Sequence, residues 1–393
     1  MPQRAQTVLG KRLPKCILAC CQTMRRGVAG AVGLLQDTIR ASRVAMFDGG
    51  CRQAMLVELR GNVATTIKDI AQLAGVTAAT VSKVLNRKDQ SISEPTRDRI
   101  WALVKELNYT PNSIARSLIT RSSRVIGVIV PDILNAYFTE LVRACDQAAR
   151  ERGYSTILCN SDSDPQKEAA HLTFLASHGV DGIVLAASDL IPDAQLLDRL
   201  RIPLVSMDRE VPDLDCLAAR IDTDYEQGAF LSARHLIEAG HTRIAFVSGN
   251  PLASNTRIRR AGFERAHREA GLPVDAELIE CGAFNHRFGL LATRTLLDRT
   301  SFSAMSCMSD MLAMGATVAL RERGLAVPDD CAVMGFDNIY IAPLLVRPLS
   351  TIERRISQAG YLAIGALIDF LDDQTHPRRM VLMEPTVVQR ETT

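Results

Sequence analysis

The chain has 393 residues, of which 47% are hydrophobic and 23% are charged. This composition excludes a wholly disordered chain, and the length exceeds what one hydrophobic core ordinarily organises, so we expect two or three domains. No apolar run reaches the ~18 residues that a membrane-spanning helix needs, so we expect no membrane partner.

The formal net charge of +2 conceals a gradient along the chain. Residues 1–63 contain 10 Lys and Arg against 3 Asp and Glu, residues 64–124 contain 10 against 5, and residues 125–393 contain 26 against 36. A basic front on an acidic remainder is typical of a head that binds a polyanion, carried by a soluble body.

The first 63 residues show no sustained hydrophobic period, and we expect a poorly ordered basic extension. Two interpretations stay open. The segment is a basic arm that contacts DNA phosphates, or it is translated from an upstream start codon chosen in error, with Met55 or a codon just after it as the true start. The ten cysteines form no CxxC pair, which indicates reduced thiols in a cytoplasmic protein without a metal site.

The stretch TTIKDIAQLAGVTAATVSKVLN, residues 65–86, predicts two short amphipathic helices. Thr66 can cap the first, and Gly75 permits the left-handed conformation that ends it. Thr77 can cap a second helix over 78–86. A third helix follows Ser93. The pattern is typical of a helix-turn-helix unit within 64–110, or of an ordinary helical hairpin.

The whole run from 65 to 132 resembles the head of the LacI/GalR family of transcriptional regulators. The stretches that carry the resemblance are IKDIAQLAGV, TVSKVLN, LNYTPNSIARSL and IGVIVPD. The resemblance implies that the second helix enters the major groove of double-stranded operator DNA. The base-reading positions it implies are Ala78, Ala79 and Lys83, and the phosphate-contacting positions are Thr66, Thr77, Thr80, Ser82 and Asn86.

The two alanines depart from family members that carry larger polar residues there. Alanine offers only apolar contact, for example to a thymine methyl, so we expect Lys83 to carry most of the direct discrimination from this helix, at ~1–3 kcal/mol per good contact.

The segment 111–123 resembles the family's hinge, which follows Pro111. The resemblance implies a short helix that folds on operator DNA and pairs with its twin from a second subunit, and a leucine, Leu118, that wedges into the minor groove. The hinge residues it implies are Ile114, Ala115, Arg116 and Leu118. A plain linker is the alternative.

From residue 124 onward, short apolar runs rich in β-branched residues alternate with patterns long enough for helices. This alternation predicts parallel sheets covered by helices on both faces. The predicted helices cover 136–152, 165–179, 193–200, 224–240, 255–271, 286–299, 310–324 and 356–373. The runs divide into two Rossmann-like lobes, about 124–222 and 224–345. The resemblance implies a periplasmic-binding-protein fold in which 348–372 returns to the first lobe and 376–393 to the second.

Polar and aromatic residues follow the predicted strands, where ligands of such sheets bind. Arg259 and Asp337 match the family's ligand-binding arginine and aspartate. Asp and Arg side chains between aromatic faces are typical of a sugar or polyol pocket. The alternative is that several of them cap helices or pair with each other. The candidates are Asn135, Phe138, Asp208, Arg209, Asp222, Arg259, Phe284, Ser309, Asp310 and Asp337.

The sequence contains no GxxxxGK, GxSxG, HExxH or DxDxDG motif, and its seven histidines are dispersed. We therefore expect no enzyme and no cofactor. The sequence favours a ligand-responsive DNA-binding repressor of carbohydrate genes that acts as a homodimer, since no heptad pattern extends the chain towards a tetramer. A sugar-binding receptor is the alternative, but it would need an export signal and no DNA-binding head.

Overall fold

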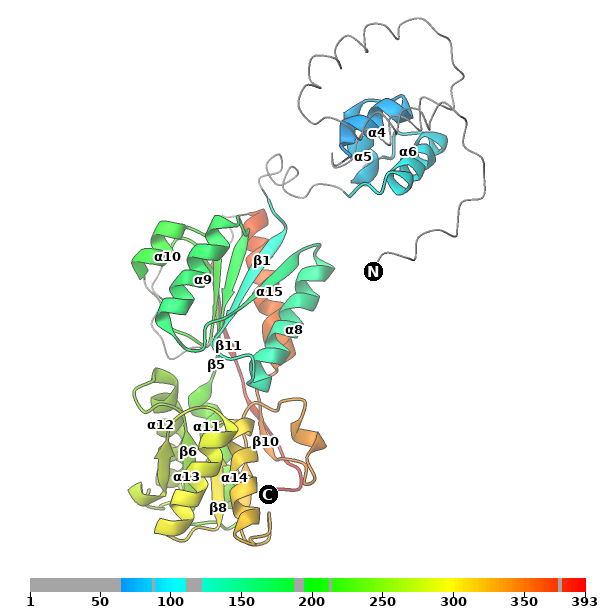
Figure 1. The fold of residues 1–393 in the computed structure, drawn as a ribbon. Helices are drawn as coiled ribbons and strands as arrows, with labels where there is room; N and C mark the ends of the chain where they lie inside the picture. The colour runs from blue at the N-terminus through cyan, green and yellow to red at the C-terminus, as the bar shows by residue number, and fades with distance from the viewer. Residues whose placement is uncertain (1–64, 87–88, 111–121, 187–193, 212–213, 374–376) are drawn as a thin grey trace, which may run out of the picture. The chain divides into compact units, whose positions relative to one another are not determined.

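The computed structural model describes residues 65–86, 89–110, 122–186, 194–211, 214–373 and 377–393 (Figure 1). The chain divides into two compact units, Met1–Pro111 and Asn112–Thr393, which are treated separately. The predicted basic extension lies outside the described residues. So do the four predicted hinge residues, Ile114, Ala115, Arg116 and Leu118.

The described residues of the first unit form three helices, α4 (Ile67–Ala74), α5 (Ala78–Leu85) and α6 (Glu94–Glu106). Thr66 caps α4 through a reciprocal capping box with Asp69, and Gly75 ends the helix at a φ of 65°. Thr77 caps α5. The three helices enclose a small core of Ile70, Ala71, Ala74, Val81, Val84 and Ile100. The predicted helix-turn-helix is confirmed.

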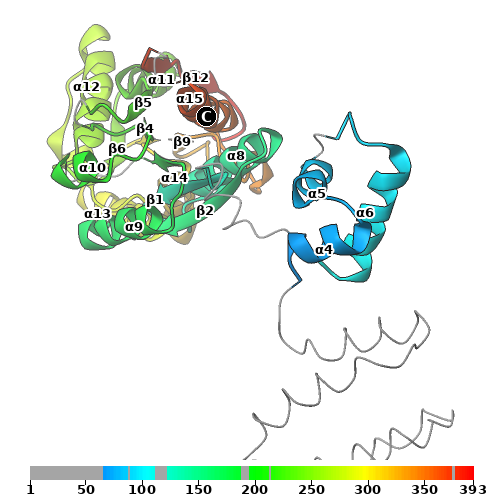
Figure 2. The ribbon, with the colours of Figure 1, turned by 90° about the horizontal axis from the view of Figure 1, so that it is seen from above.

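The first lobe of the second unit contains a parallel sheet in the order β11-β5-β4-β3-β1-β2. Helices α8 (Ala136–Glu151) and α15 (Ile356–Asp372) pack together on one face, and α9 (Pro165–Ser177) and α10 (Ala194–Leu200) cover the other (Figure 2). The strands are β1 (Val125–Val130), β2 (Ser155–Asn160), β3 (Gly182–Leu185), β4 (Leu204–Met207), β5 (Leu217–Thr223) and β11 (Arg379–Met383).

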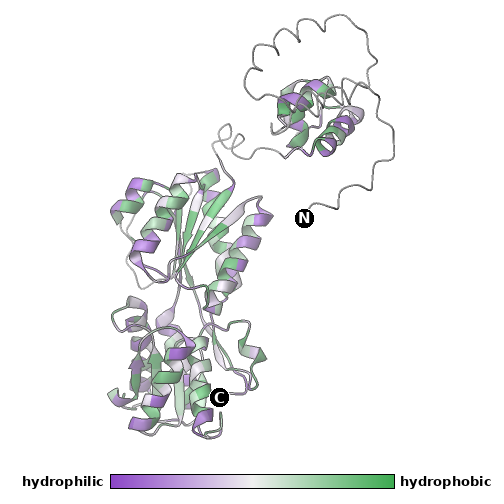
Figure 3. Ribbon diagram, in the orientation of Figure 1, coloured by the Kyte–Doolittle hydropathy of each residue, from purple (hydrophilic) through white to green (hydrophobic). Residues whose placement is uncertain are grey.

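The second lobe contains a four-stranded parallel sheet in the order β7-β6-β8-β9. Its strands are β6 (Ile244–Ser248), β7 (Ile279–Cys281), β8 (Ala304–Cys307) and β9 (Ala332–Met334). Alternate residues of β6 face two separate cores, one under α11 (Tyr225–Glu238) and α12 (Ser254–Glu269), the other under α13 (His286–Arg299) and α14 (Asp310–Glu322). The hydropathy colouring shows the apolar strands enclosed by helices with polar outer faces (Figure 3).

The chain crosses between the lobes three times: after β5, after β10 (Thr351–Glu353), and between β11 and β12 (Thr386–Val388). Strands β10 and β12 pair antiparallel, and β10 is linked to the end of β9 by two isolated bridges. The lobe boundaries implied by the resemblance therefore need correction. The start of 348–372 lies with the second lobe, and the start of 376–393 adds a strand to the first.

The helix pair α11–α12 packs closely because a glycine lies at the contact. A Cβ atom on Gly262 would lie 2.0 Å from the carbonyl oxygen of Glu226. Gly365, within α15, has no atom within 4 Å of an added Cβ. No helix in the described part of the chain is long and apolar enough to cross a membrane.

Candidate functional site

The outer face of α5 presents two of the three predicted base-reading residues. Ala79 and Lys83 are exposed one helical turn apart, while Val81 and Val84 are buried beneath them. Ala78, the third predicted base-reading residue, is half-buried and packs against the core of the head. The small side chain of Ala79 leaves space on this face of the helix beside the long side chain of Lys83.

The predicted phosphate-contacting residues lie at the start of α4 and along α5, and four of them are joined in pairs by hydrogen bonds. The Thr77 hydroxyl lies 2.9 Å from that of Thr80, and it accepts a hydrogen bond from the Thr80 amide at 3.2 Å. The Asn86 side chain donates to the Ser82 carbonyl oxygen at 2.8 Å. Thr66 is exposed at the start of α4. These local bonds fix polar side chains at helix ends, where amide groups favour anions.

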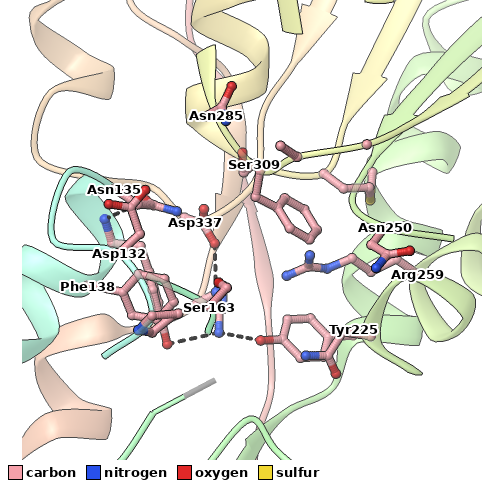
Figure 4. A pocket seen from close by; sticks show the side chains of 18 of the residues that line it. Asp132, Asn135, Phe138, Ser163, Tyr225, Asn250, Arg259, Asn285, Ser309 and Asp337 are labelled. Atoms are coloured by element: carbon pink, nitrogen blue, oxygen red, sulfur yellow. Dashed lines mark hydrogen bonds and ion pairs between the residues drawn. The ribbon is translucent and has the colours of Figure 1, made fainter. Parts of the chain in front are cut away.

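A cleft of about 650 Å³ lies between the two lobes of the second unit (Figure 4). Residues that follow the carboxyl ends of β1, β2, β6, β7, β8 and β9 line it, as expected where parallel strands of two sheets point towards one another. Six of the ten predicted effector-binding residues belong to the lining: Asn135, Phe138, Arg259, Phe284, Ser309 and Asp337.

Arg259 is a buried cation that borders the cleft and makes its described contacts with aromatic rings. Its guanidinium carbon lies 4.2 Å from the ring centre of Tyr225, 4.9 Å from that of Phe284 and 5.0 Å from that of Phe336. Its Nε is buried without a hydrogen-bond partner in the structure, and burial lowers the pKa of the guanidinium. A ligand acceptor in the cleft would satisfy this donor.

Phe284 reaches Arg259 because the backbone beside it lacks a side chain. A Cβ on Gly249 would lie 2.0 Å from the Phe284 ring, so this position after β6 needs glycine. Asn135 and Ser309 each line the cleft and also cap a helix, α8 and α14 respectively. The predicted capping role and the predicted cleft position therefore coexist in these two residues.

Asp337 lines the cleft in a backbone conformation that L residues rarely adopt, with a φ of 119°. Such a conformation persists only where the surrounding structure holds it. The Asp337 amide donates to Ile352 at 2.9 Å, and its Oδ1 accepts from Arg354 at 2.7 Å. Burial raises the pKa of Asp337, while Arg354 and Arg259 oppose that rise.

Sequence reasoning missed Arg354, which lines the floor of the cleft. Its guanidinium donates to Asp208 at 2.5 Å and to the hydroxyls of Tyr137 and Tyr225 at 2.9 and 2.7 Å. Arg354 follows a strand of three residues, too short for a hydrophobic period to reveal. The only signal was the arginine pair Arg354 and Arg355, which follows the β-branched residues Thr351 and Ile352 after one glutamate.

The other four predicted residues do not belong to the lining and contact other protein groups instead. Asp208 binds Arg354 beneath the cleft, and Arg209 forms a bidentate ion pair with Glu168 at 2.7 and 2.8 Å. Asp222 pairs with Arg220 at 2.5 Å. Asp310 accepts hydrogen bonds from the Thr351 hydroxyl and the Ile339 amide. Pairing within the protein is thus the observed arrangement for these four.

No group of three or more His, Cys, Asp or Glu side chains among the described residues is placed to hold a metal ion.

Two family models match the chain. The model described as "Bacterial regulatory proteins, lacI family" matches residues 66–112. The model described as "Periplasmic binding proteins and sugar binding domain of LacI family" matches residues 123–386.

Curated relatives are similar over most of their length. The chain is 36% identical over 332 residues to the HTH-type transcriptional repressor PurR of Aliivibrio fischeri (strain MJ11), covering 83% of this chain and 97% of that protein. It is 37% identical over 333 residues to PurR of Vibrio parahaemolyticus serotype O3:K6, covering 83% and 98%.

Solved structures of transcriptional regulators are also similar to this chain in fold. A lac repressor dimer bound to operator and the anti-inducer ONPF is 26% identical with a TM-score of 0.72, covering 84% of this chain and 99% of that one. A complex of the transcriptional regulator CelR with cellobiose is 29% identical with a TM-score of 0.63, covering 84% and 100%.

Proposed function

This chain belongs to the LacI family of bacterial regulatory proteins, and from that premise we propose that it is a repressor whose hold on operator DNA is set by a sugar or polyol bound between its lobes. As a family member it is a DNA-binding regulator and not an enzyme. In the proposal, two chains pair as a homodimer in the cytoplasm, and their α5 helices enter successive major grooves of a near-palindromic site.

The choice of a sugar rests on the observation that Arg259 and Asp337 both line the same cleft. A sugar hydroxyl both accepts and donates hydrogen bonds, so it suits a guanidinium without an acceptor and a carboxylate at the same time. Phe138 and Phe284 offer apolar faces for the ring. The structure of the relative CelR, solved with cellobiose, supports the same class of ligand.

A purine base is the second candidate, because the most similar curated relatives described above are named PurR. A flat base could stack on Phe138 or Phe284. The polar lining nevertheless comes from both lobes. The first lobe contributes Asp132, Asn135 and Ser163, and the second contributes Asn250, Asn255 and Asn285. Donors and acceptors on many sides suit hydroxyl groups that project in several directions better than a planar edge, and this favours the sugar.

Thermal unfolding of the full chain tests the ligand class. The probes are D-ribose, D-xylulose, cellobiose, hypoxanthine and guanine, each at a series of concentrations. We expect a sugar to stabilise the protein, by ~2.7 kcal/mol when its concentration is 100 times the Kd, and the bases to have no effect. Stabilisation by a base alone would replace the sugar with the second candidate.

Gel-shift binding to genomic fragments tests the DNA-binding side. We expect selection of particular fragments, an affinity that falls steeply as salt rises, and a change in affinity when the stabilising sugar is added. Light scattering on the same sample should give the mass of a dimer. A mass of four chains would contradict the proposed assembly, and equal binding to all fragments would contradict the proposed repressor.

A further inference from the structure

We propose that Arg354 is the positioning residue that couples the two lobes, so that a change at Asp337 in the cleft is passed through its guanidinium to the first lobe. The proposal rests on the function proposed above, because it says how a bound sugar would alter the arrangement of the lobes. It adds a residue that sequence reasoning did not identify.

Arg354 divides its hydrogen bonds between the lobes at the point where the chain crosses from one to the other. Towards the first lobe it donates to Asp208 at 2.5 Å and Tyr137 at 2.9 Å, with a longer bond of 3.3 Å to Thr223. Towards the second lobe it donates to Asp337 and to Tyr225, each at 2.7 Å. A planar guanidinium with five fixed donors suits this task, whereas a lysine could not reach both sides at once.

The acids on the two sides are both held in unusual backbone conformations that support their contact with Arg354. Asp208 has a φ of 51° and Asp337 a φ of 119°. Asp208 also accepts from the Tyr137 hydroxyl at 3.0 Å and from the Thr223 amide at 2.6 Å. The first-lobe half of the network is therefore tightly connected to the start of α8 and the end of β5.

The network is buried, which makes its charges interact strongly. Arg354, Asp208 and Asp337 all have side chains that are 4% exposed. In such a place the loss or redirection of one partner is costly to the others. A ligand hydroxyl that donates a hydrogen bond to Asp337 competes for the carboxylate that binds Arg354. Arg354 is bound to Asp208 of the first lobe at the same time. Contact in the cleft and lobe arrangement are thereby linked.

Among the described residues, two other hydrogen bonds that involve side chains span the lobes, and we expect them to hold the lobes together when Arg354 is changed. The Asn255 side chain donates to the Asp208 carbonyl oxygen at 3.2 Å, and the Tyr340 amide donates to Glu140 at 2.5 Å. We therefore expect an Arg354 variant to fold with looser coupling, not with separated lobes.

Hydrogen exchange measured by mass spectrometry on the full chain without ligand tests the link directly. In Arg354→Gln we expect exchange to rise at least about tenfold in peptides from both lobes, at the starts of α8 and α11. The variant loses charged hydrogen bonds to both Asp208 and Asp337, and the loss of one such bond alone corresponds to about tenfold. The matched control is Arg209→Gln. Arg209 is as buried as Arg354, at 3% exposed, but its ion pair with Glu168 lies within the first lobe. This control should raise exchange in the first lobe alone.

The functional readout is the ratio of genomic-fragment affinities with and without a sugar, using D-ribose or cellobiose according to which stabilises the wild type. At a sugar concentration that saturates each variant in thermal unfolding, we expect Arg354→Gln to bring this ratio close to one, Arg354→Lys to give an intermediate ratio, and Arg209→Gln to keep the wild-type ratio. If the Gln variant does not fold, Arg354→Lys serves for both measurements.

Two results would overturn the coupling role. One is hydrogen exchange in Arg354→Gln that rises in a single lobe. The other is an Arg354→Gln variant that binds sugar and keeps the wild-type ratio of fragment affinities with and without sugar. A wild-type protein that binds neither sugar would count against the proposed function instead, and the exchange experiment would still decide whether Arg354 links the lobes.

Discussion

Asp310 lies wholly buried at the first residue of α14, where it accepts hydrogen bonds from the Thr351 hydroxyl at 2.5 Å and the Ile339 amide at 2.9 Å. Burial, together with the neighbouring charge of Asp337, raises the pKa of Asp310 well above its ordinary value of 3.8, although the hydrogen bonds from the Thr351 hydroxyl and the Ile339 amide and the charge of Arg390 act in the opposite direction. The folded state therefore favours the protonated form of this side chain.

We expect the replacement Asp310→Asn to stabilise the protein at neutral pH. An acid whose folded pKa is raised leaves stability intact below its unfolded pKa and lowers it as pH rises towards the folded pKa. Asparagine keeps the shape, with its oxygen towards Ile339 and its NH₂ towards Thr351, and removes the penalty. The variant should gain ~1 kcal/mol or more over the wild type between pH 5 and pH 8 in urea unfolding.

The matched control is Asp298→Asn, because the Asp298 side chain is 63% exposed. This control removes one surface acid, which pairs with Arg323, without relieving a buried charge, and it should not stabilise the protein. A stability difference for Asp310→Asn that shrinks as pH rises would show that Asp310 is charged in the folded protein.

Residue roles were only partly readable from sequence. Asn135 and Phe138 were placed in the cleft because they follow a strand, and strand ends converge whatever their detailed packing, whereas Arg259 was placed there by the family resemblance. Sequence reasoning could not tell that Arg209 turns to Glu168, since that partner lies 41 positions earlier and the choice depends on three-dimensional distance.

At the scale of elements, helix α12 approaches α11 so closely that only glycine fits at position 262. We expect Gly262→Ala to destabilise the protein by ~1–3 kcal/mol, because the added methyl would lie against the backbone of α11 and force the helices apart. Gly365→Ala should do the reverse and stabilise by up to ~1 kcal/mol, since nothing lies within 4 Å and alanine favours the helix. Thermal unfolding of the two variants checks both signs, and equal effects would contradict the close contact.

The elements themselves were predicted well where their pattern was long. All eight predicted helices of the body are present, with ends that differ by at most two residues; α8 covers 136–151 against a predicted 136–152, for example. Strands β10 and β12, of three residues each, were missed because so short a run carries no period. Strand β11 was missed although it has five residues, since its partner β5 lies far away in the chain.

At the scale of the whole molecule, DNA contact and ligand contact belong to separate compact units. We expect Lys83→Ala to weaken binding to the preferred genomic fragment by ~1–3 kcal/mol and to leave sugar-induced stabilisation unchanged. Arg259→Ala should abolish the sugar response and leave fragment binding without sugar intact. For each of the two variants, gel shift measures fragment binding and thermal unfolding measures stabilisation by the sugar.

A control for charge alone is Lys105→Ala, which also removes one cation from the head but lies in the last turn of α6. It should reduce binding to preferred and random fragments alike, as expected when a general electrostatic attraction is lost. If Lys83→Ala behaved in the same way, Lys83 would not be the residue that reads sequence.

The late return of β11 to the first sheet has a consequence for how the protein is made. Every other strand of that sheet lies between residues 125 and 223, yet its edge is supplied by residues 379–383. A ribosome must therefore deliver all four strands of the second lobe's parallel sheet, as one continuous block, before the first sheet gains its last strand. Of the two parallel sheets, the one that is begun first is thus the one completed last.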